Sequence, residues 1–200
     1  MSDGDLWIMG IEDVEREIER AAQYLSGVPF GVERAMIGAF NRAAMAGRTE
    51  GARQVRAEYT VPYKEVLKSY KLDRATRQKI SASVESKGAS LRLSTFRHNP
   101  KTDTTGARRR QVRVSVKQGS AKPIGQGFVH KGNIFQRVGK TSRPIKHLAG
   151  PAIPVMLNNP NVVDAVQGRM VEVSIKRLDH EVGRILAGHG RQTRSGANRW

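Results

Sequence analysis

A chain of 200 residues, of which 38% are hydrophobic, is long enough to fold as one domain around a packed core. It has no cysteine, which excludes disulfide bonds, thiolate catalysis and Cys-ligated zinc. No apolar run approaches the roughly 20 residues that span a bilayer, and acids replace the basic start of a signal peptide, so we expect a soluble protein that is neither exported nor membrane-bound.

The charge is large and unevenly placed. The chain has 35 Lys and Arg against 18 Asp and Glu, a formal net charge of +17. Residues 104–163 contain eleven Lys or Arg and no acid, whereas the first twenty residues contain seven acids and two arginines. Most single Lys and Arg residues simply lie on a solvent-exposed surface. A stretch whose charges are all positive attracts polyanions or the acidic face of a protein.

Apolar residues recur every three or four positions in the first third of the chain and predict helices. We expect an acidic helix within residues 1–30, from about residue 11 to residue 26. Two further helices are expected within residues 31–70: one that runs towards Tyr59, and a short one from residue 61 to residue 70 with Pro62 in its first turn.

The period then falls to two, which predicts an antiparallel sheet over residues 79–139 with one basic, solvent-facing side. Residues 80–84 and 91–95 are expected to form a hairpin across Lys87 and Gly88. Residues 112–116 predict a further strand, with Arg113, Ser115 and Lys117 on the solvent-facing side. Residues 128–130 and 134–138 predict a second pair, joined by residues 131–133.

Residues 143–158 place three prolines among apolar residues, which predicts an extended path against another surface. Asn159 and Pro160 are suited to the N-cap and first position of a long helix that ends near residue 187. Residues 188–200 have no apolar face and predict a flexible basic tail. Together these elements predict an α+β fold over residues 1–187, with N-terminal helices and a long C-terminal helix packed on an antiparallel β-sheet.

The sequence contains no arrangement typical of a catalytic or metal site. His180 and Glu181 do not have a second His one helical turn later, as a zinc-binding HExxH would, so we expect them at a solvated helix end. The glycines of residues 125–127 do not follow a strand, and residues 139–141 resemble a P-loop whose first glycine is replaced by Ile134. We therefore expect no enzyme activity, no cofactor and no bound metal.

Several segments in order resemble the prophage minor tail protein Z family. These are RAMIGAFNR at residues 34–42, Ser94-Thr95-Phe96, GNIFQR at residues 132–137 with the following Val138-Gly139-Lys140, PIKHLAGPAIPVML at residues 144–157, and His180-Glu181. The resemblance runs from about residue 30 to residue 187. It implies a virion protein, assembled in the host cytoplasm, that completes the upper end of a long tail so that the tail can join a DNA-filled head.

The same resemblance implies a homohexameric ring at the neck, with the tail terminator below it and a head-completion or connector protein above it. The acidic first helix and the basic stretch could then meet between neighbouring subunits. In the proline-rich segment we expect an interface between ring subunits or with a partner. Its expected residues are Pro144, Ile145, Leu148, Gly150, Pro151 and Pro154.

The basic residues are candidates for contact with duplex DNA in the channel or with an acidic partner, and the sequence does not choose between them. The candidates are Arg108, Arg109, Arg110, Arg113, Lys117, Arg191, Arg194 and Arg199. Few aromatic residues lie among them, which weakens a base-stacking platform. Two alternative functions remain: a tail terminator or tail-tube protein, and a sequence-independent nucleic-acid-binding module.

Overall fold

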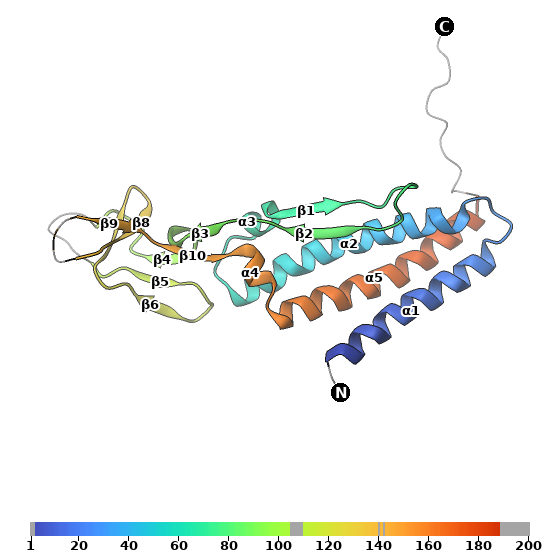
Figure 1. Cartoon of the computed structure of the whole chain (residues 1–200), viewed down its shortest axis with the longest axis horizontal. Helices are drawn as coiled ribbons and strands as arrows, with labels where there is room; N and C mark the ends of the chain where they lie inside the picture. Colours follow the sequence, from blue (N-terminus) through green and yellow to red (C-terminus); the bar gives the residue numbers. More distant parts are fainter. Residues whose placement is uncertain (1–2, 105–109, 140, 142, 189–200) are drawn as a thin grey trace, which may run out of the picture. The chain divides into compact units, whose positions relative to one another are not determined.

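The computed structural model describes residues 3–104, 110–139, 141 and 143–188, with side chains from residue 12 onwards. It divides into two compact units. Figure 1 labels the helices and strands along the chain. Unit 1 comprises Met1–Gly47, Leu72–Val84 and Val166–Trp200, and unit 2 comprises Arg48–Lys71 and Glu85–Ala165. The α+β fold class is confirmed, because helices are combined with antiparallel sheets and the chain has a long C-terminal helix.

Three long helices form the helical part of the fold: α1 (Asp3–Tyr24), α2 (Gly31–Glu58) and α5 (Pro160–Leu186). α1 begins before the expected residue 11, and it contains Gly10 in its interior, where glycine costs about 1 kcal/mol relative to Ala. The predicted start of α5 is confirmed, and Oδ1 of Asn159 accepts a hydrogen bond from the backbone N–H of Asn161 at 3.2 Å. No helix among the described residues is long and apolar enough to cross a membrane.

The core of unit 1 lies where these three helices pack together. Its buried members come from all three helices and are mostly small or aliphatic. They are Ala21, Leu25, Ala35, Ala39, Leu178, Val182 and Ile185. The buried alanines of α2, Ala35 and Ala39, are small enough to allow close approach of the neighbouring helices.

The described strands form four small sheets instead of one. The first pairs β1 (Tyr70–Asp73) with β2 (Ser83–Ser86), and the second pairs β3 (Ser90–Arg92) with β10 (Ala149–Ala152). The third contains β4 (Arg97–Asn99), β5 (Arg113–Ser115) and β6 (Ala121–Pro123). The fourth contains β7 (Gly127–His130), β8 (Asn133–Arg137) and β9 (Ile145–His147). The remaining short elements are α3 (Tyr63–Lys68), a 3-10 turn at Leu93–Thr95 and α4 (Ile153–Leu157).

The hairpin expected between residues 80–84 and 91–95 is wrong. β2 pairs with β1, whose first residue, Tyr70, was expected to end the third helix, and β3 pairs with β10, which lies much later in the sequence. The alternation of apolar residues fixes which face of a strand is buried but not which strand lies beside it.

The second expected hairpin is confirmed. β7 and β8 pair in antiparallel register from Gly127 opposite Gln136 to His130 opposite Asn133. The two residues between the strands, Lys131 and Gly132, both have positive φ, 47° and 72°. This is the backbone that a two-residue hairpin requires, because its twist matches that of the strands.

Two local expectations in unit 2 need correction. Ser115, expected on the solvent-facing side of its strand, is only 8% exposed, and its hydroxyl donates to the carbonyl of Lys117 at 2.7 Å. The proline-rich segment is extended only as far as Ala152, because Ile153–Leu157 forms α4. Pro154 is compatible with this helix since it lies in the first turn, where its missing N–H costs no hydrogen bond.

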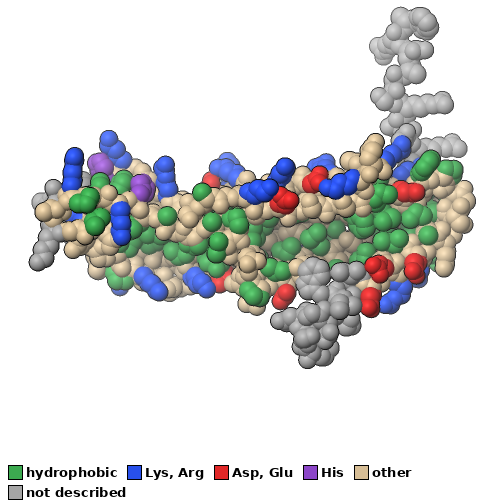
Figure 2. Space-filling view, viewed as in Figure 1, with side chains coloured by type: hydrophobic (Ala, Val, Ile, Leu, Met, Phe, Trp, Pro, Cys, Tyr) green, Lys and Arg blue, Asp and Glu red, His purple; other side chains and the backbone are tan. Residues whose placement is uncertain are grey.

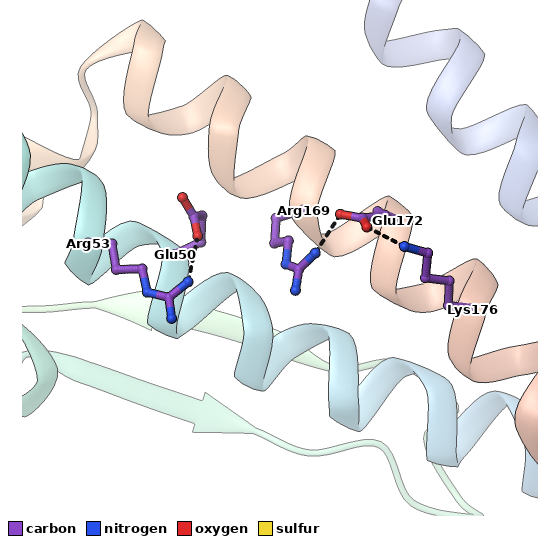
Figure 3. Close-up of polar contacts among 5 residues, drawn as sticks. All are labelled: Glu50, Arg53, Arg169, Glu172 and Lys176. Atoms are coloured by element: carbon purple, nitrogen blue, oxygen red, sulfur yellow. Dashed lines mark hydrogen bonds and ion pairs between the residues drawn. The ribbon is translucent and has the colours of Figure 1, made fainter.

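Ion pairs between neighbouring turns neutralise much of the charge on the long helices. On α5, the Glu172 carboxylate oxygens lie 2.6 Å from Nη1 of Arg169 and from Nζ of Lys176 (Figure 3). The hydrogen bond from Lys176, and next to it the one from Arg169, lower the pKa of Glu172. On α2, Glu50 lies 3.6 Å from Arg53 (Figure 3). Exposed pairs of this kind stabilise a fold only slightly, but they leave less charge for a partner.

Candidate functional site

The excess positive charge is concentrated in unit 2. Among the side chains that the structure describes, unit 2 has eighteen Lys and Arg against six Asp and Glu, whereas unit 1 has eleven against ten. On the face shown in Figure 2, Lys, Arg and His side chains gather over β8 and β9, with no acidic side chain among the described ones there. A surface of this kind favours a polyanion or an acidic protein as its partner.

Of the four expected contact arginines in residues 108–113, the structure describes Arg110, which lies before β5, and Arg113, which is its first residue. Both are exposed, and no ion pair joins either of them to an acid in the described part of the chain. Their charge is therefore available to a partner. The other expected contact arginines, Arg108, Arg109, Arg191, Arg194 and Arg199, lie outside the described residues.

Lys117 differs because its charge already has a partner within unit 2. Its Nζ lies 2.9 Å from Oε1 of Glu58 at the end of α2, and the hydrogen bond to Glu58 raises the pKa of Lys117. The other carboxylate oxygen of Glu58 accepts from Nδ2 of Asn159, at 2.6 Å. The Glu58 carboxylate thus joins the end of α2, the chain after β5 and the start of α5. Lys117 offers less charge to another molecule than the two unpaired arginines.

The proline-rich segment connects two sheets of unit 2. The backbone N–H of Leu148 donates to Ile134 on β8 at 3.3 Å, and its carbonyl accepts from Leu93 at 3.0 Å. Of the six expected interface residues, Pro144 and Ile145 are exposed. The half-buried ones are Leu148, Gly150, Pro151 and Pro154. A partner can therefore reach the start of the segment, while its later part holds the sheets together.

The aromatic side chains on the outer face of the β7-β8-β9 sheet contact one another. The rings of Phe128 and Phe135 are stacked, with their centroids 5.7 Å apart. The ring of His147, on β9, has its centroid 4.6 Å from that of Phe135. The guanidinium of Arg137 lies 4.7 Å from the ring of Phe128. Because neighbouring side chains occupy these ring faces, the row stabilises the sheet and offers little surface on which a base could stack. This arrangement argues against base stacking on these rings.

Glu181 on α5 is buried, which corrects its expected place at a solvated helix end. It is 1% exposed, with Arg177 2.8 Å from Oε1 and Arg184 2.5 Å from Oε2. A Cβ at Gly38 on α2 would lie 2.9 Å from the Glu181 carboxyl carbon, so a larger residue there would force the Glu181 side chain to shift. His180 is exposed, and no group of three metal-ligating side chains is present among the described residues.

Beside Glu181 lies a surface pocket of about 440 Å³ in unit 1, which we call the arginine pocket. Its lining includes Arg34 and Ile37 from α2, Thr76 and Arg77 from the loop after β1, and Arg184 and Ile185 from α5. Sequence reasoning missed this pocket because its three arginines lie outside the acid-free stretch. Two of the segments on which the family resemblance rests meet at this pocket. Residues 34–42 supply Arg34, Gly38 and Asn41, and the His180-Glu181 pair supplies Glu181.

The loop of the arginine pocket is held in place by Asn41. Its side chain donates from Nδ2 to the carbonyl of Ala75 at 3.1 Å and accepts at Oδ1 from the backbone N–H of Ala75 at 2.9 Å. Ala75 is 5% exposed, and the N–H of Thr76 donates to the carbonyl of Lys79 at 2.8 Å to close a turn. The position of Arg77 is thus fixed by hydrogen bonds of the neighbouring backbone.

The family model for prophage minor tail protein Z (GPZ) matches residues 17–189. Because this match covers most of the chain, the protein belongs to the prophage minor tail protein Z family and is a structural protein of the bacteriophage tail. The resemblance seen in the sequence is thereby confirmed. No curated protein and no solved structure matches the chain.

Proposed function

We propose that this protein completes the upper end of a long phage tail and joins the tail to the DNA-filled head at the neck, around the DNA channel. The observation that carries the proposal is the family match over residues 17–189. The excess positive charge of unit 2 supports it, since a protein beside the channel lies close to a dense line of phosphates.

The proposed partners follow from this position. The protein forms a homohexameric ring, with the tail terminator below it and a head-completion or connector protein above it. The exposed arginines Arg110 and Arg113 contact either duplex DNA or an acidic ring of a neighbouring protein. The exposed start of the proline-rich segment, Pro144 and Ile145, lies at a subunit or partner interface.

The proposal is tested by particle morphology after complementation of a deletion. Replacing both Pro151, in β10, and Pro154, in α4, by Gly makes the backbone of this part of the proline-rich segment more flexible. We expect filled heads and separate tails of normal length in electron micrographs. Replacing Pro29, which is exposed in the turn between α1 and α2, is the matched control and is expected to leave infectious particles.

Other outcomes contradict the proposal. Normal infectious particles from the double variant reject the role given to the proline-rich segment. Tails of uncontrolled length would mean that the protein is the tail terminator. A neck reconstruction in which the ring has a number of subunits other than six rejects the hexamer.

A further inference from the structure

The arginine pocket has the chemistry of a carboxylate site. Arg34 and Arg77 are in no ion pair with an acid in the described part of the chain, so two guanidinium groups without carboxylate partners face one pocket. Arg184 is oriented by Glu181, which accepts from both its Nε, at 2.9 Å, and its Nη2. Guanidinium groups held in fixed positions bind carboxylates through paired hydrogen bonds.

The charge of unit 1 favours a protein segment with a few carboxylates, and not a nucleic acid, as the ligand of the arginine pocket. Its described side chains are almost balanced, eleven basic against ten acidic, whereas unit 2 has a large positive excess. A duplex is therefore attracted to unit 2, because a phosphate backbone binds through many positive charges at once. A protein segment with a few carboxylates needs only a local group of arginines.

The chain itself presents such a segment on α1, which we call the acidic stripe: Glu12, Glu15 and Glu19. The three residues are exposed and are spaced by three and four positions, so they lie on one face of the helix. The other two described acids in this part of α1 are already paired, Asp13 with Arg16 and Glu17 with Arg20. No ion pair within the described part of the chain involves the stripe.

We infer that the arginine pocket of one subunit binds the acidic stripe of a second copy of this chain. The stripe and the pocket are different patches of the same chain, and a contact between different patches generates a ring when its rotation closes. The inference rests on the proposed ring and names its subunit contact. It replaces the sequence-based hypothesis that the acidic helix meets the basic stretch of residues 104–163.

Charge reversal with compensation tests the contact in the assembled virion. Two variants, one with Arg34→Glu and Arg77→Glu and the other with Glu15→Arg and Glu19→Arg, are each expected to lower the titre of complemented phage about tenfold or more. A chain that carries all four substitutions restores opposite charges across the contact, and its titre is expected to recover. Arg42→Glu, at an exposed position of α2 outside the pocket, is the control and should leave the titre unchanged.

A cross-link measures the same contact without changing a charge. The chain has no cysteine, so Ala22→Cys beside the acidic stripe and Gln78→Cys beside Arg77 provide the only thiols. We expect a bis-maleimide to link chains of intact particles into a ladder of oligomers when both substitutions are present, and to give no ladder with either alone.

The possible results separate the inference from the proposed function. Joined particles without a cross-link, or a fourfold variant no better than the worse double variant, overturn the inference and leave the neck function standing. A loss of titre from the pocket variant alone, without compensation, means that the pocket binds an acidic segment of another protein. A ladder in particles whose tails have uncontrolled length supports the contact and rejects the proposed neck function.

Discussion

Gly150 lies so close to Phe96 that a Cβ at this position would be 2.5 Å from Cε2 of the ring. Phe96 is only 2% exposed and follows the 3-10 turn after β3, the strand with which β10 pairs. The ring therefore packs directly against the backbone of β10 at this glycine. The Phe96 ring occupies the space that a side chain at residue 150 would need.

This contact predicts that Gly150→Ala destabilises the protein. The added methyl group must displace a buried ring, and overpacking of this kind typically costs about 1–3 kcal/mol of the free energy of unfolding. Gly88→Ala is the control, because nothing lies within 4 Å of a Cβ built there. Denaturant unfolding of the two variants measures the difference. Equal stabilities would mean that the ring moves aside freely.

The buried carboxylate of Glu181 predicts a second loss of stability. Glu181→Gln removes the negative charge that Arg177 and Arg184 share, and a hydrogen bond to a charged group contributes about 1.5–3 kcal/mol. Both arginines are partly exposed and can be hydrated, so we expect a cost at the lower end of this range. Glu172→Gln on the same helix is the control, because Glu172 also binds two basic side chains but is exposed. Its effect on thermal unfolding should be much smaller.

Tyr70 predicts a loss of stability at alkaline pH. Burial raises its pKa from 10.0 to about 12, so the folded protein holds the phenol proton more tightly than the unfolded chain. Below pH 10 the phenol is protonated in both states, and its full contribution to stability is present. As the pH rises from 10 to about 12, the unfolded state ionises first and is favoured.

The measurement is chemical denaturation across this pH range for the wild type and Tyr70→Phe. We expect the variant to lose less stability than the wild type between pH 10 and about 12. Lysines also titrate in this range, and the comparison cancels their contribution because both proteins contain the same lysines. Identical pH profiles would show that Tyr70 ionises as readily in the folded protein as in the unfolded chain.

The unpaired arginines of unit 2 predict salt-dependent binding of duplex DNA. Because each neutralised phosphate releases counterions, affinity for any sequence should fall steeply with salt. Arg110→Ala and Arg113→Ala are each expected to lower the slope of log K against log salt by about 0.9. Lys117→Ala should change the slope less, since Lys117 is paired with Glu58. Fluorescence anisotropy with two unrelated duplexes measures this, and sequence-selective binding that survives high salt would favour a nucleic-acid-binding module.

The sequence by itself determined the features that depend on neighbouring residues. The three- and four-residue period predicted α2, Asn159 and Pro160 marked the start of α5, and Lys131 with Gly132 marked the turn between β7 and β8. Each of these signals acts within a few residues, through helix geometry, capping or turn conformation. The ordered motifs also indicated the correct family.

Only the tertiary structure decided which distant segments meet. β3 pairs with β10, which lies much later in the sequence, and Asn41 on α2 fixes Ala75 after β1. Glu181 resembles a solvated residue in the sequence, yet it is buried because Gly38, on another helix, leaves room for it and two arginines balance its charge. Strand partners and buried charges depend on contacts between residues far apart in the chain, and local periodicity contains no information about those contacts.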